Sequence, residues 1–352
     1  MKLFINATGN ISPQKTFGHP PLLQELITHT GNRLRCLEPD YSSYIDVKLI
    51  RRMSRIIKMG VAAALDCLKE AGVKEPDAIV TGTAFGCLED TGVFLRKMVE
   101  QKEALLTPTA FIQSTHNTIG AQIALLLQCH KYNNTFVHRG FSFESALLDA
   151  MLLIEEGLAN NVLVGSIDEI TDFSHSIISR FGRYKKESAS NLELFSQPSK
   201  GTIAGEGASF FLLSNEKAEN SYANLDALHT FYDPANTKEI EEEILSFLKD
   251  QSLSVKDLDL VLVGKNGDPG NDAIFDDLNH SVFAASQTCN FKHLCGDYPT
   301  SSGFALWLAA SITKAGNLPS AFGLDNGKRI HRILVYNQFQ GIHHSLLLVS
   351  SC

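Results

Sequence analysis

The sequence predicts an α/β fold made of two similar halves that pack against each other. Segments whose apolar residues recur at helical spacing alternate with short, wholly apolar strands, which is typical of α/β layers. One unit of helix, link, strand and glycine turn also occurs twice along the chain. An internal repeat of this kind predicts two α/β halves of similar structure.

The first copy of the unit begins with a predicted helix over residues 51–71. Its apolar residues fall on one face at helical spacing, and Gly72 ends it. An apolar strand follows at residues 78–80, and a turn rich in glycine and threonine follows at residues 81–86. A continuous apolar run bounded by turn residues indicates a strand that is covered on both faces.

The second copy has the same order and nearly the same length. It comprises a helix over residues 239–249, a buried strand over 258–263 and a turn over 264–267. The two stretches align as ALDCLKEAGVKEPDAIVTGTAFG and ILSFLKDQSLSVKDLDLVLVGKNG. The match predicts that the two halves are built alike.

A strand–helix–strand unit also occurs in both halves. Its predicted segments are residues 135–138, 142–156 and 162–165, and, in the second copy, residues 291–294, 301–314 and 333–336. We therefore expect residues 1–215 to form an N-terminal half and residues 216–352 a C-terminal half, with no linker between them. Residues 185–200, rich in Ser, Lys and Asn, are predicted to form a surface loop.

The composition excludes several classes of protein. A net charge of −8 and a pI near 5.8 argue against nucleic-acid binding, which normally needs a basic face. The sequence has no block of Lys and Arg that would indicate a membrane signal. It also has no secretory leader with a long apolar core and no apolar run of membrane-spanning length. These features predict a cytoplasmic protein without membrane insertion.

The seven cysteines are scattered without a CxxC pair. In a cytoplasmic protein such a set predicts reduced thiols that pack as small hydrophobic residues. Cys289 and Cys295 lie near His293, but a zinc site needs a fourth ligand, and the sequence offers no obvious source for it. No metal and no cofactor are therefore expected.

Six short strings resemble β-ketoacyl synthases, condensing enzymes with the thiolase fold. In chain order they are TGNISP (8–13), RRMSR (51–55), LTPTAFIQSTHN (106–117), GAQIA (120–124), GEGA (205–208) and NQFQG (337–341). They span nearly the whole chain in the order that the family has. The resemblance implies a thiolase-like fold, with duplicated α/β halves in a layered αβαβα arrangement.

The resemblance also implies where the catalytic residues would lie. The family takes up an acyl chain on a Cys at the N-terminus of a buried helix, where the helix dipole favours the thiolate. Counting back from Gly157 places Gly140 at this position, so the nucleophile is missing. Ser142 is nearby, but a Ser hydroxyl needs an adjacent base, and we expect Ser142 to cap the helix.

Two His residues of the family hold the enolate that forms when malonyl thioester loses CO₂. The turn after the strand over 258–263 has Asn266 where the first His is expected. In the string KHLCGD, Asp297 stands at the position of the second His, while Lys292 is retained as a supporting residue. An anionic Asp opposes enolate formation, so the resemblance implies a degenerate triad of Gly140, Asn266 and Asp297.

Other residues are expected near this pocket. Phe339 matches the family's gate residue beside the acyl chain, although core packing explains it equally well. His138 and Phe141 are expected to line the pocket. His116 and His293 are also within possible reach, but a lone His near a core strand is more often structural. Aromatic side chains are therefore available to fill the relic pocket.

The leading functional hypothesis is a non-catalytic partner subunit. Chain length factors resemble ketosynthases, lack the nucleophile, pair with an active β-ketoacyl-ACP synthase and help to shape the tunnel that limits product length. Such a subunit would work in fatty-acid, polyketide or polyene biosynthesis with an acyl carrier protein. The compact length and the string THNTIG (115–120) look closest to partner subunits of bacterial aryl-polyene or flexirubin-type systems.

Two alternatives stay open. The first is an unconventional acyltransferase or decarboxylase that acts on acyl thioesters, for which Cys295 and Ser142 are the candidate nucleophiles. The second is a homodimer that binds an acyl chain or an acyl carrier protein without chemistry. All three hypotheses imply a dimer, because the family pairs the strand that here covers residues 134–138 across a two-fold axis.

Overall fold

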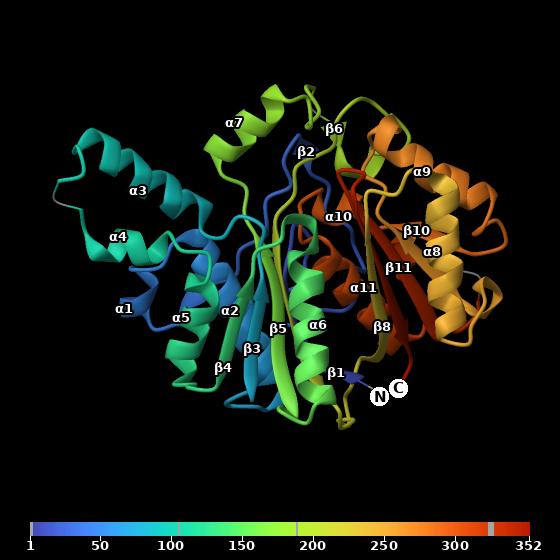
Figure 1. Ribbon diagram of the computed structural model, residues 1–352, viewed down its shortest axis with the longest axis horizontal. Helices are drawn as coiled ribbons and strands as arrows, with labels where there is room; N and C mark the ends of the chain where they lie inside the picture. The colour runs from blue at the N-terminus through green and yellow to red at the C-terminus, as the bar shows by residue number, and fades with distance from the viewer. Residues whose placement is uncertain (1–2, 105, 188, 323–326) are drawn as a thin grey trace.

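The computed structural model describes residues 3–104, 106–187, 189–322 and 327–352. Its helices are α1 (Val47–Ile50), α2 (Arg55–Ala71), α3 (Leu88–Glu100), α4 (Pro108–Gln113), α5 (Thr118–Leu127), α6 (Ser142–Glu155), α7 (Asp172–Arg180), α8 (Thr237–Asp250), α9 (Pro269–His280), α10 (Lys292–Cys295) and α11 (Ser302–Ala315). Figure 1 shows their arrangement around the strands.

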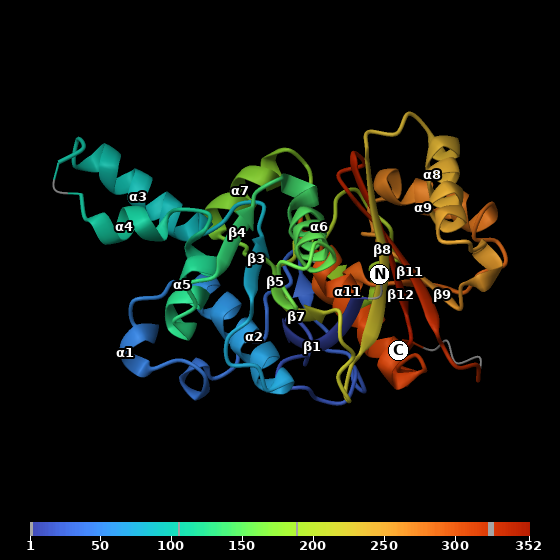
Figure 2. The ribbon, with the colours of Figure 1, turned by 60° about the horizontal axis from the view of Figure 1, so that its bottom comes forward.

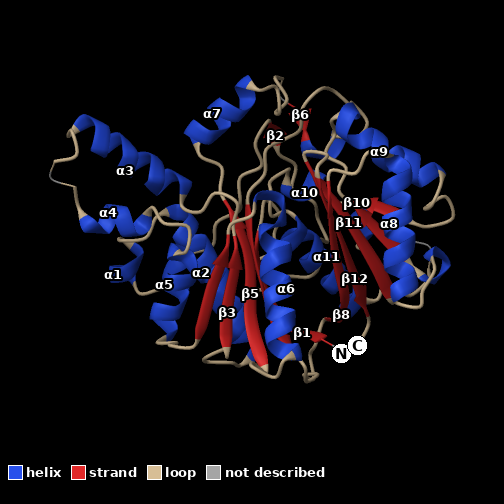
Figure 3. Ribbon diagram, viewed as in Figure 1, coloured by secondary structure: helices blue, strands red, loops and turns tan. Residues whose placement is uncertain are grey.

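Ten strands form one continuous sheet, which Figure 3 shows in red. They are β1 (Leu3–Ile11), β3 (Ala78–Gly82), β4 (Tyr132–Phe136), β5 (Asn161–Asp168), β7 (Gly207–Ser214), β8 (Ala223–Tyr232), β9 (Leu260–Val263), β10 (Thr288–Asn290), β11 (Arg332–Phe339) and β12 (His343–Ser350). The short strands β2 (Thr30–Gly31) and β6 (Ala189–Ser190) pair separately.

The order of the strands confirms the duplication. It runs β10-β9-β11-β12-β8-β1-β7-β5-β3-β4, so the two halves mirror each other about the β8–β1 junction. Counted from the outer edge of each half, the first three strands are parallel to one another, and each of the next two is antiparallel to the strand before it. The junction itself is short and joins Leu3–Ile5 to residues 223–225. The division at residue 215 falls in the connection between β7 and β8, and as a domain boundary it stays a prediction.

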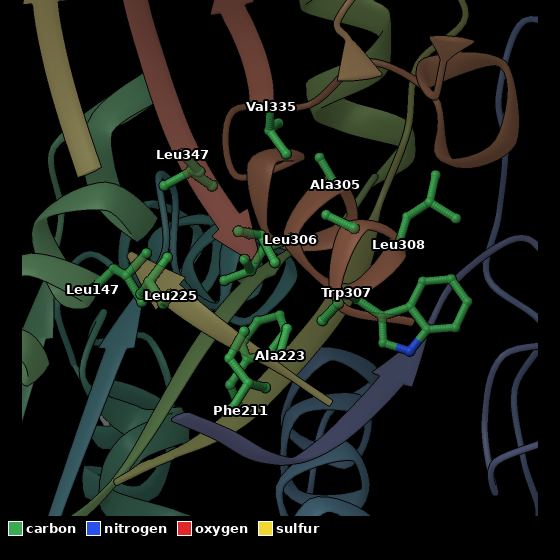
Figure 4. Close-up of a cluster of buried hydrophobic side chains, with 14 of the residues drawn as sticks. Leu147, Phe211, Ala223, Leu225, Ala305, Leu306, Trp307, Leu308, Val335 and Leu347 are labelled. Carbon is green, nitrogen blue, oxygen red and sulfur yellow. The ribbon is translucent and has the colours of Figure 1, made fainter. Parts of the chain in front are cut away.

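Three apolar clusters define the layers of an α/β fold with the thiolase-like arrangement. Helix α2 and part of α5 cover the outer face of the first half of the sheet. Helices α8 and α9 cover the outer face of the second half. Helices α6 and α11 lie between the two halves, in the largest cluster. Figure 4 shows this central layer, where Leu147 of α6 and Leu306 of α11 lie with strand residues from both halves.

The boundaries of several elements differ from the predicted ones. Helix α2 ends as expected, because Gly72 adopts a left-handed conformation with φ of 67°, but it begins at Arg55, after the extended Ser54, rather than at residue 51. Strand β4 ends at Phe136, since the chain then turns and Arg139 has φ of 50°.

The predicted strand at residues 291–294 is wrong. Strand β10 ends at Asn290, opposite the last residue of β9, and residues 292–295 form the single turn α10, which Gly296 closes with φ of 77°. Four apolar and polar residues are too few to distinguish a strand from a helical turn.

The predicted surface loop over residues 185–200 is partly buried. Lys185 and Asn191 have almost no exposed surface, whereas the residues around them are mostly exposed. The Lys185 ammonium donates hydrogen bonds to the carbonyl oxygens of Ser199 and Gly267, at 2.9 and 3.0 Å. Composition alone missed this anchor, because one of the two carbonyl groups that hold Lys185 belongs to Gly267, which is distant in sequence.

Helices α3 and α4 project from the body of the molecule, as Figures 1 and 2 both show. Neither helix has a buried residue. Among the described residues, no helix is long and apolar enough to cross a membrane.

Candidate functional site

Gly140 lies in a short 3₁₀ turn (Arg139–Phe141) immediately before α6. A β-carbon on Gly140 would lie 2.8 Å from both Cβ and Cγ of His343, and 3.1 Å from Cβ of Phe339. Real Cβ atoms do not approach other carbons to 2.8 Å, so the space that a side chain would need is already occupied. The packing around this turn therefore favours glycine at residue 140.

The Ser142 hydroxyl is engaged by the turn that precedes α6. It accepts a hydrogen bond from the His138 N–H at 2.8 Å and donates one to the Arg139 carbonyl, also at 2.8 Å. Ser142 therefore does not cap the helix as predicted, since no N–H group of α6 bonds to its oxygen. It closes the preceding turn, and with both neighbours in the backbone it has no adjacent base.

Asn266, Lys292 and Asp297 are brought together in one hydrogen-bonded chain. The Lys292 ammonium contacts Asp297 Oδ1 at 2.7 Å and the Gln338 carbonyl at 2.8 Å. The Asn266 amide donates to Asp297 Oδ2 at 3.3 Å. Asp297 thus accepts one hydrogen bond from each of these two side chains and joins them into one buried network.

The loop that carries Asn266 is fixed by residues that the sequence did not indicate. Asp272 accepts the N–H groups of Asn266 and Gly267, both at 2.8 Å. The Thr202 hydroxyl donates to the Asn266 carbonyl at 2.8 Å. Burial raises the pKa of Asp272, and the two N–H groups oppose that shift. An Asp six residues after an Asn, in the first turn of a helix, is the only signal that the sequence contains.

An aromatic cluster covers the turn at Gly140. The Phe141 ring lies edge-on to His343, with ring centroids 4.8 Å apart, and His343 lies edge-on to Tyr232 at 5.3 Å. The His138 ring contacts Phe141 at 5.7 Å, and Phe339 contacts His343 at 6.3 Å. The predicted pocket residues Phe339, His138 and Phe141 thus lie together, but around the packed ring of His343, which the sequence analysis did not identify.

The space that remains beside Asp297 is small. The cavity there has a volume of about 50 Å³, which accommodates a few water molecules. Ligand pockets are typically about 300–1,000 Å³, so this cavity has no room for an acyl chain. Its lining comprises Phe85, Ile178, Arg183, Tyr184, Thr202, Asn271, Asp297, Tyr298, Pro299, Phe339 and Gln340.

The other candidate groups lie elsewhere or are inert. Cys295 is fully buried, and burial raises the pKa of its thiol, which disfavours the nucleophilic thiolate. Burial lowers the pKa of His293 to about 4, and its ring lies edge-on to Phe195 at 5.4 Å. His116 is exposed beside Gly86. None of these groups hydrogen-bonds to Asp297 within the described part of the chain.

Glu144, in the first turn of α6, was also missed. Its side chain is buried, and neither carboxyl oxygen has a hydrogen-bond partner among the described residues. Burial raises the pKa of Glu144, while the nearby hydroxyls of Ser302 and Ser345 and the charge of Lys292 oppose that shift.

Two of the strings noticed in the sequence meet in space. Arg55, the last residue of RRMSR, binds Glu206 of GEGA through two hydrogen bonds of 2.8 and 2.5 Å. Glu206 is fully buried and also accepts the N–H groups of Cys36 and Ile170, each at 2.9 Å. This network joins α2 to the start of β7, so these two strings have a structural role.

Similarity to known proteins shows the family of this chain. The model of the β-ketoacyl synthase N-terminal domain matches residues 38–227. No curated protein matches the sequence.

Several solved structures share the fold at low sequence identity. The ishigamide ketosynthase/chain length factor has a TM-score of 0.77 and 16% identity over 100% of this chain and 99% of that one. AntDE:AntF is an acyl carrier protein of a type II polyketide synthase in complex with its ketosynthase. It has a TM-score of 0.73 and 14% identity, over 100% of this chain and 99% of that one. The ketosynthase ApeO in complex with its chain length factor ApeC, from Xenorhabdus doucetiae, has a TM-score of 0.75 and 15% identity. The match covers 100% of this chain and 98% of that one.

The family model spans more than half of the 352 residues, and the structural matches extend over the whole chain. The chain therefore belongs to the β-ketoacyl synthase family and has its thiolase-like fold.

Proposed function

We propose that this chain is a non-catalytic, chain-length-factor-type subunit that pairs with an active β-ketoacyl-ACP synthase in fatty-acid, polyketide or polyene biosynthesis. The observation that carries the proposal is the glycine at the nucleophile position, whose side-chain space is filled by His343 and Phe339. Without a thiolate at this position, an acyl chain cannot be loaded there. A condensing role then requires a second subunit that supplies the complete site.

An unpartnered surface beside β4 supports the pairing. Strand β4 pairs with β3 along one edge, and no described strand lies along the other, which leaves its backbone groups available to a second chain. Next to it, α6 exposes Leu148 and Leu152, at 48% and 44% of their surface. An exposed apolar face beside a free strand edge is what a subunit interface needs.

The projecting arm of α3 and α4 adds to this surface. Val99, Phe111 and Ile112 are all more than half exposed, although they are large and apolar. Helices with no buried residue gain little stability from packing within one chain. We expect the arm to pack against the partner.

The partners and the pathway follow from the same proposal. One of the structures that match this fold is a complex of an acyl carrier protein with its ketosynthase. We propose that the dimer formed by this chain also works with an acyl carrier protein. We place the subunit in the cytoplasm. The finer assignment, to an aryl-polyene or flexirubin-type system, rests on the sequence string THNTIG.

The alternatives have weaker support. An acyltransferase or decarboxylase needs a reactive group, but the Cys295 thiol is fully buried and the Ser142 hydroxyl is bonded to backbone atoms. A homodimer that binds acyl chains or an acyl carrier protein needs no reactive group. It differs from the leading proposal only in the identity of the second subunit.

The test is a pull-down of the tagged full-length chain from its native host at native expression, with partners identified by mass spectrometry. We expect recovery of a Cys-containing ketosynthase in equal amount. A Leu148→Asp/Leu152→Asp variant is expected to recover at least about tenfold less, because charges at an apolar interface cost more than about 1.4 kcal/mol. Leu245→Asp on α8, at a residue that is 49% exposed on a different helix, is the matched control. Recovery of the chain alone overturns the proposal in favour of a homodimer.

A further inference from the structure

A mostly apolar groove with a volume of about 430 Å³ runs along α3 and reaches Phe173 at the start of α7. The α3 residues that line it include Leu88, Gly92, Leu95 and Val99, which recur at spacings of four, three and four residues. This spacing forms one stripe along the helix, as in a helix of a coiled coil. Leu95 and Val99 are 48% and 77% exposed, so the described chain leaves the stripe largely open.

Helix α4 packs against a different side of α3. The rings of Phe94 and Phe111 lie with their centroids 5.7 Å apart, and the Thr91 hydroxyl donates a hydrogen bond to the Ser114 carbonyl at 3.0 Å. At 3.6 residues per turn, Thr91 and Phe94 lie on average about a quarter of a turn from the stripe. Figures 1 and 2 both show α4 between α3 and α5. The contact between α3 and α4 therefore leaves the stripe available to another molecule.

The shape of the stripe is complementary to itself. When two α3 helices lie antiparallel, Leu88 of one faces Val99 of the other, and Leu95 faces Gly92. A β-carbon on Gly92 would meet no atom within 4 Å, so the space beside it is open to a side chain from a second copy. Large residues that face small ones let two helices interdigitate closely. Because an antiparallel pair has two-fold symmetry, both copies use the same surface.

The charges beside the stripe are complementary in the same arrangement. Glu89 and Arg96 are seven residues apart, are both exposed and border the groove on the side away from α4. Neither side chain forms a salt bridge with another residue of the described chain. In an antiparallel pair of helices these flanking positions meet, so each Glu89 lies beside Arg96 of the second copy. Opposite charges at such positions determine the partner and the orientation of paired helices.

We propose that α3 binds α3 of a second copy of this chain in an antiparallel pair, in which Leu95 of each copy fills the gap at Gly92 of the other and Glu89 pairs with Arg96. The arm meets the ketosynthase through α4, and it meets the second copy through α3. Two copies are thereby joined while each remains able to pair with a ketosynthase. The inference does not depend on the proposed function.

The experiment is sedimentation equilibrium of the purified full-length Leu148→Asp/Leu152→Asp protein, in which association through α6 does not contribute. We expect a reversible dimer. Glu89→Arg places like charges in both contacts and should weaken the dimer about tenfold, which corresponds to about 1.4 kcal/mol. Adding Arg96→Glu restores opposite charges and should return the affinity to that of the parent protein. Lys97→Glu reverses an exposed charge on the far side of α3 and should leave the affinity unchanged.

Leu95→Asp provides a second, independent variant at an exposed residue, and it should abolish the dimer without unfolding the chain. A parent protein that stays monomeric up to about 0.1 mM, a double variant that is no tighter than Glu89→Arg, or an equal loss in Lys97→Glu overturns the proposal. None of these measurements needs a ketosynthase, so their failure is distinguishable from a failed pull-down.

Discussion

A β-carbon on Gly140 would lie 2.8 Å from the β-carbon of His343, so the turn before α6 and the first residue of β12 fit together only when residue 140 is glycine. The resemblance to β-ketoacyl synthases implies that this position corresponds to the nucleophile of an active family member. Here the ring of His343 covers it, and Phe141 and Tyr232 pack against that ring. The glycine at residue 140 and the packing of His343 over it are thus one structural feature.

This contact predicts the effect of restoring a side chain at the nucleophile position. Gly140→Cys should lower the free energy of unfolding by about 1–3 kcal/mol, the usual cost of overpacking, and should give no condensation. His343→Gly removes both clashing atoms of that residue, so the double variant should recover part of the loss. Urea unfolding of the single and double variants measures the coupling.

Gly92→Ala is the control for that experiment. Gly92 lies in α3, and a β-carbon there would meet no atom within 4 Å, so alanine should be neutral or slightly stabilising. A Gly140→Cys protein as stable as the wild type would contradict the packing argument.

The buried ion pair of Arg55 and Glu206 should be essential for stability. Glu206→Gln removes the charged partner at the buried end of the pair, while Glu38 still pairs with the partly exposed guanidinium, so the variant should cost about 1–3 kcal/mol. The exposed pair of Arg33 and Asp172 provides the comparison, since Asp172→Asn should cost less than about 1 kcal/mol. Chemical denaturation of both variants at neutral pH measures the two losses of unfolding free energy. Losses of similar size would show that burial does not determine how much an ion pair contributes to stability.

Lys292 and Asp297 should behave as a structural pair. Lys292→Met leaves the carboxylate of Asp297 buried without its cation and should cost about 3–5 kcal/mol. Adding Asp297→Asn removes the uncompensated charge, so the double variant should be more stable than Lys292→Met alone. Thermal unfolding of the three proteins tests this order. A double variant that is less stable than Lys292→Met would instead assign Asp297 a role independent of the lysine.

His293 should destabilise the fold in mild acid. Burial lowers its pKa in the folded protein to about 4, whereas the unfolded chain has the ordinary value of 6.5. Between these values the unfolded state binds the additional proton, so this residue's contribution to stability falls as the pH drops from 6.5 towards 4. His293→Phe should flatten the pH dependence of urea unfolding in that window and leave it unchanged above pH 7. An unaltered slope in the variant would contradict the assignment.

The order of elements was predictable because each follows from local periodicity. The apolar faces of α2 and α8, and the wholly apolar strands β3 and β9, gave the repeat that the mirrored sheet confirms. The strand predicted at residues 291–294 was wrong because a segment of four residues carries too little periodicity. The relation between RRMSR and GEGA was not predictable, since nothing local connects Arg55 to Glu206.

The sequence by itself determined that Gly140, Asn266 and Asp297 carry residue types unsuited to acyl condensation, because the identity of a side chain limits its chemistry wherever it lies. Only the tertiary structure decided what these positions do instead. His343 and Glu144 reach the centre through the pairing of distant strands and the packing of α6 between two halves of the sheet. Such contacts join residues separated by roughly half of the chain or more, and they arise from the burial of whole faces, which no local pattern records.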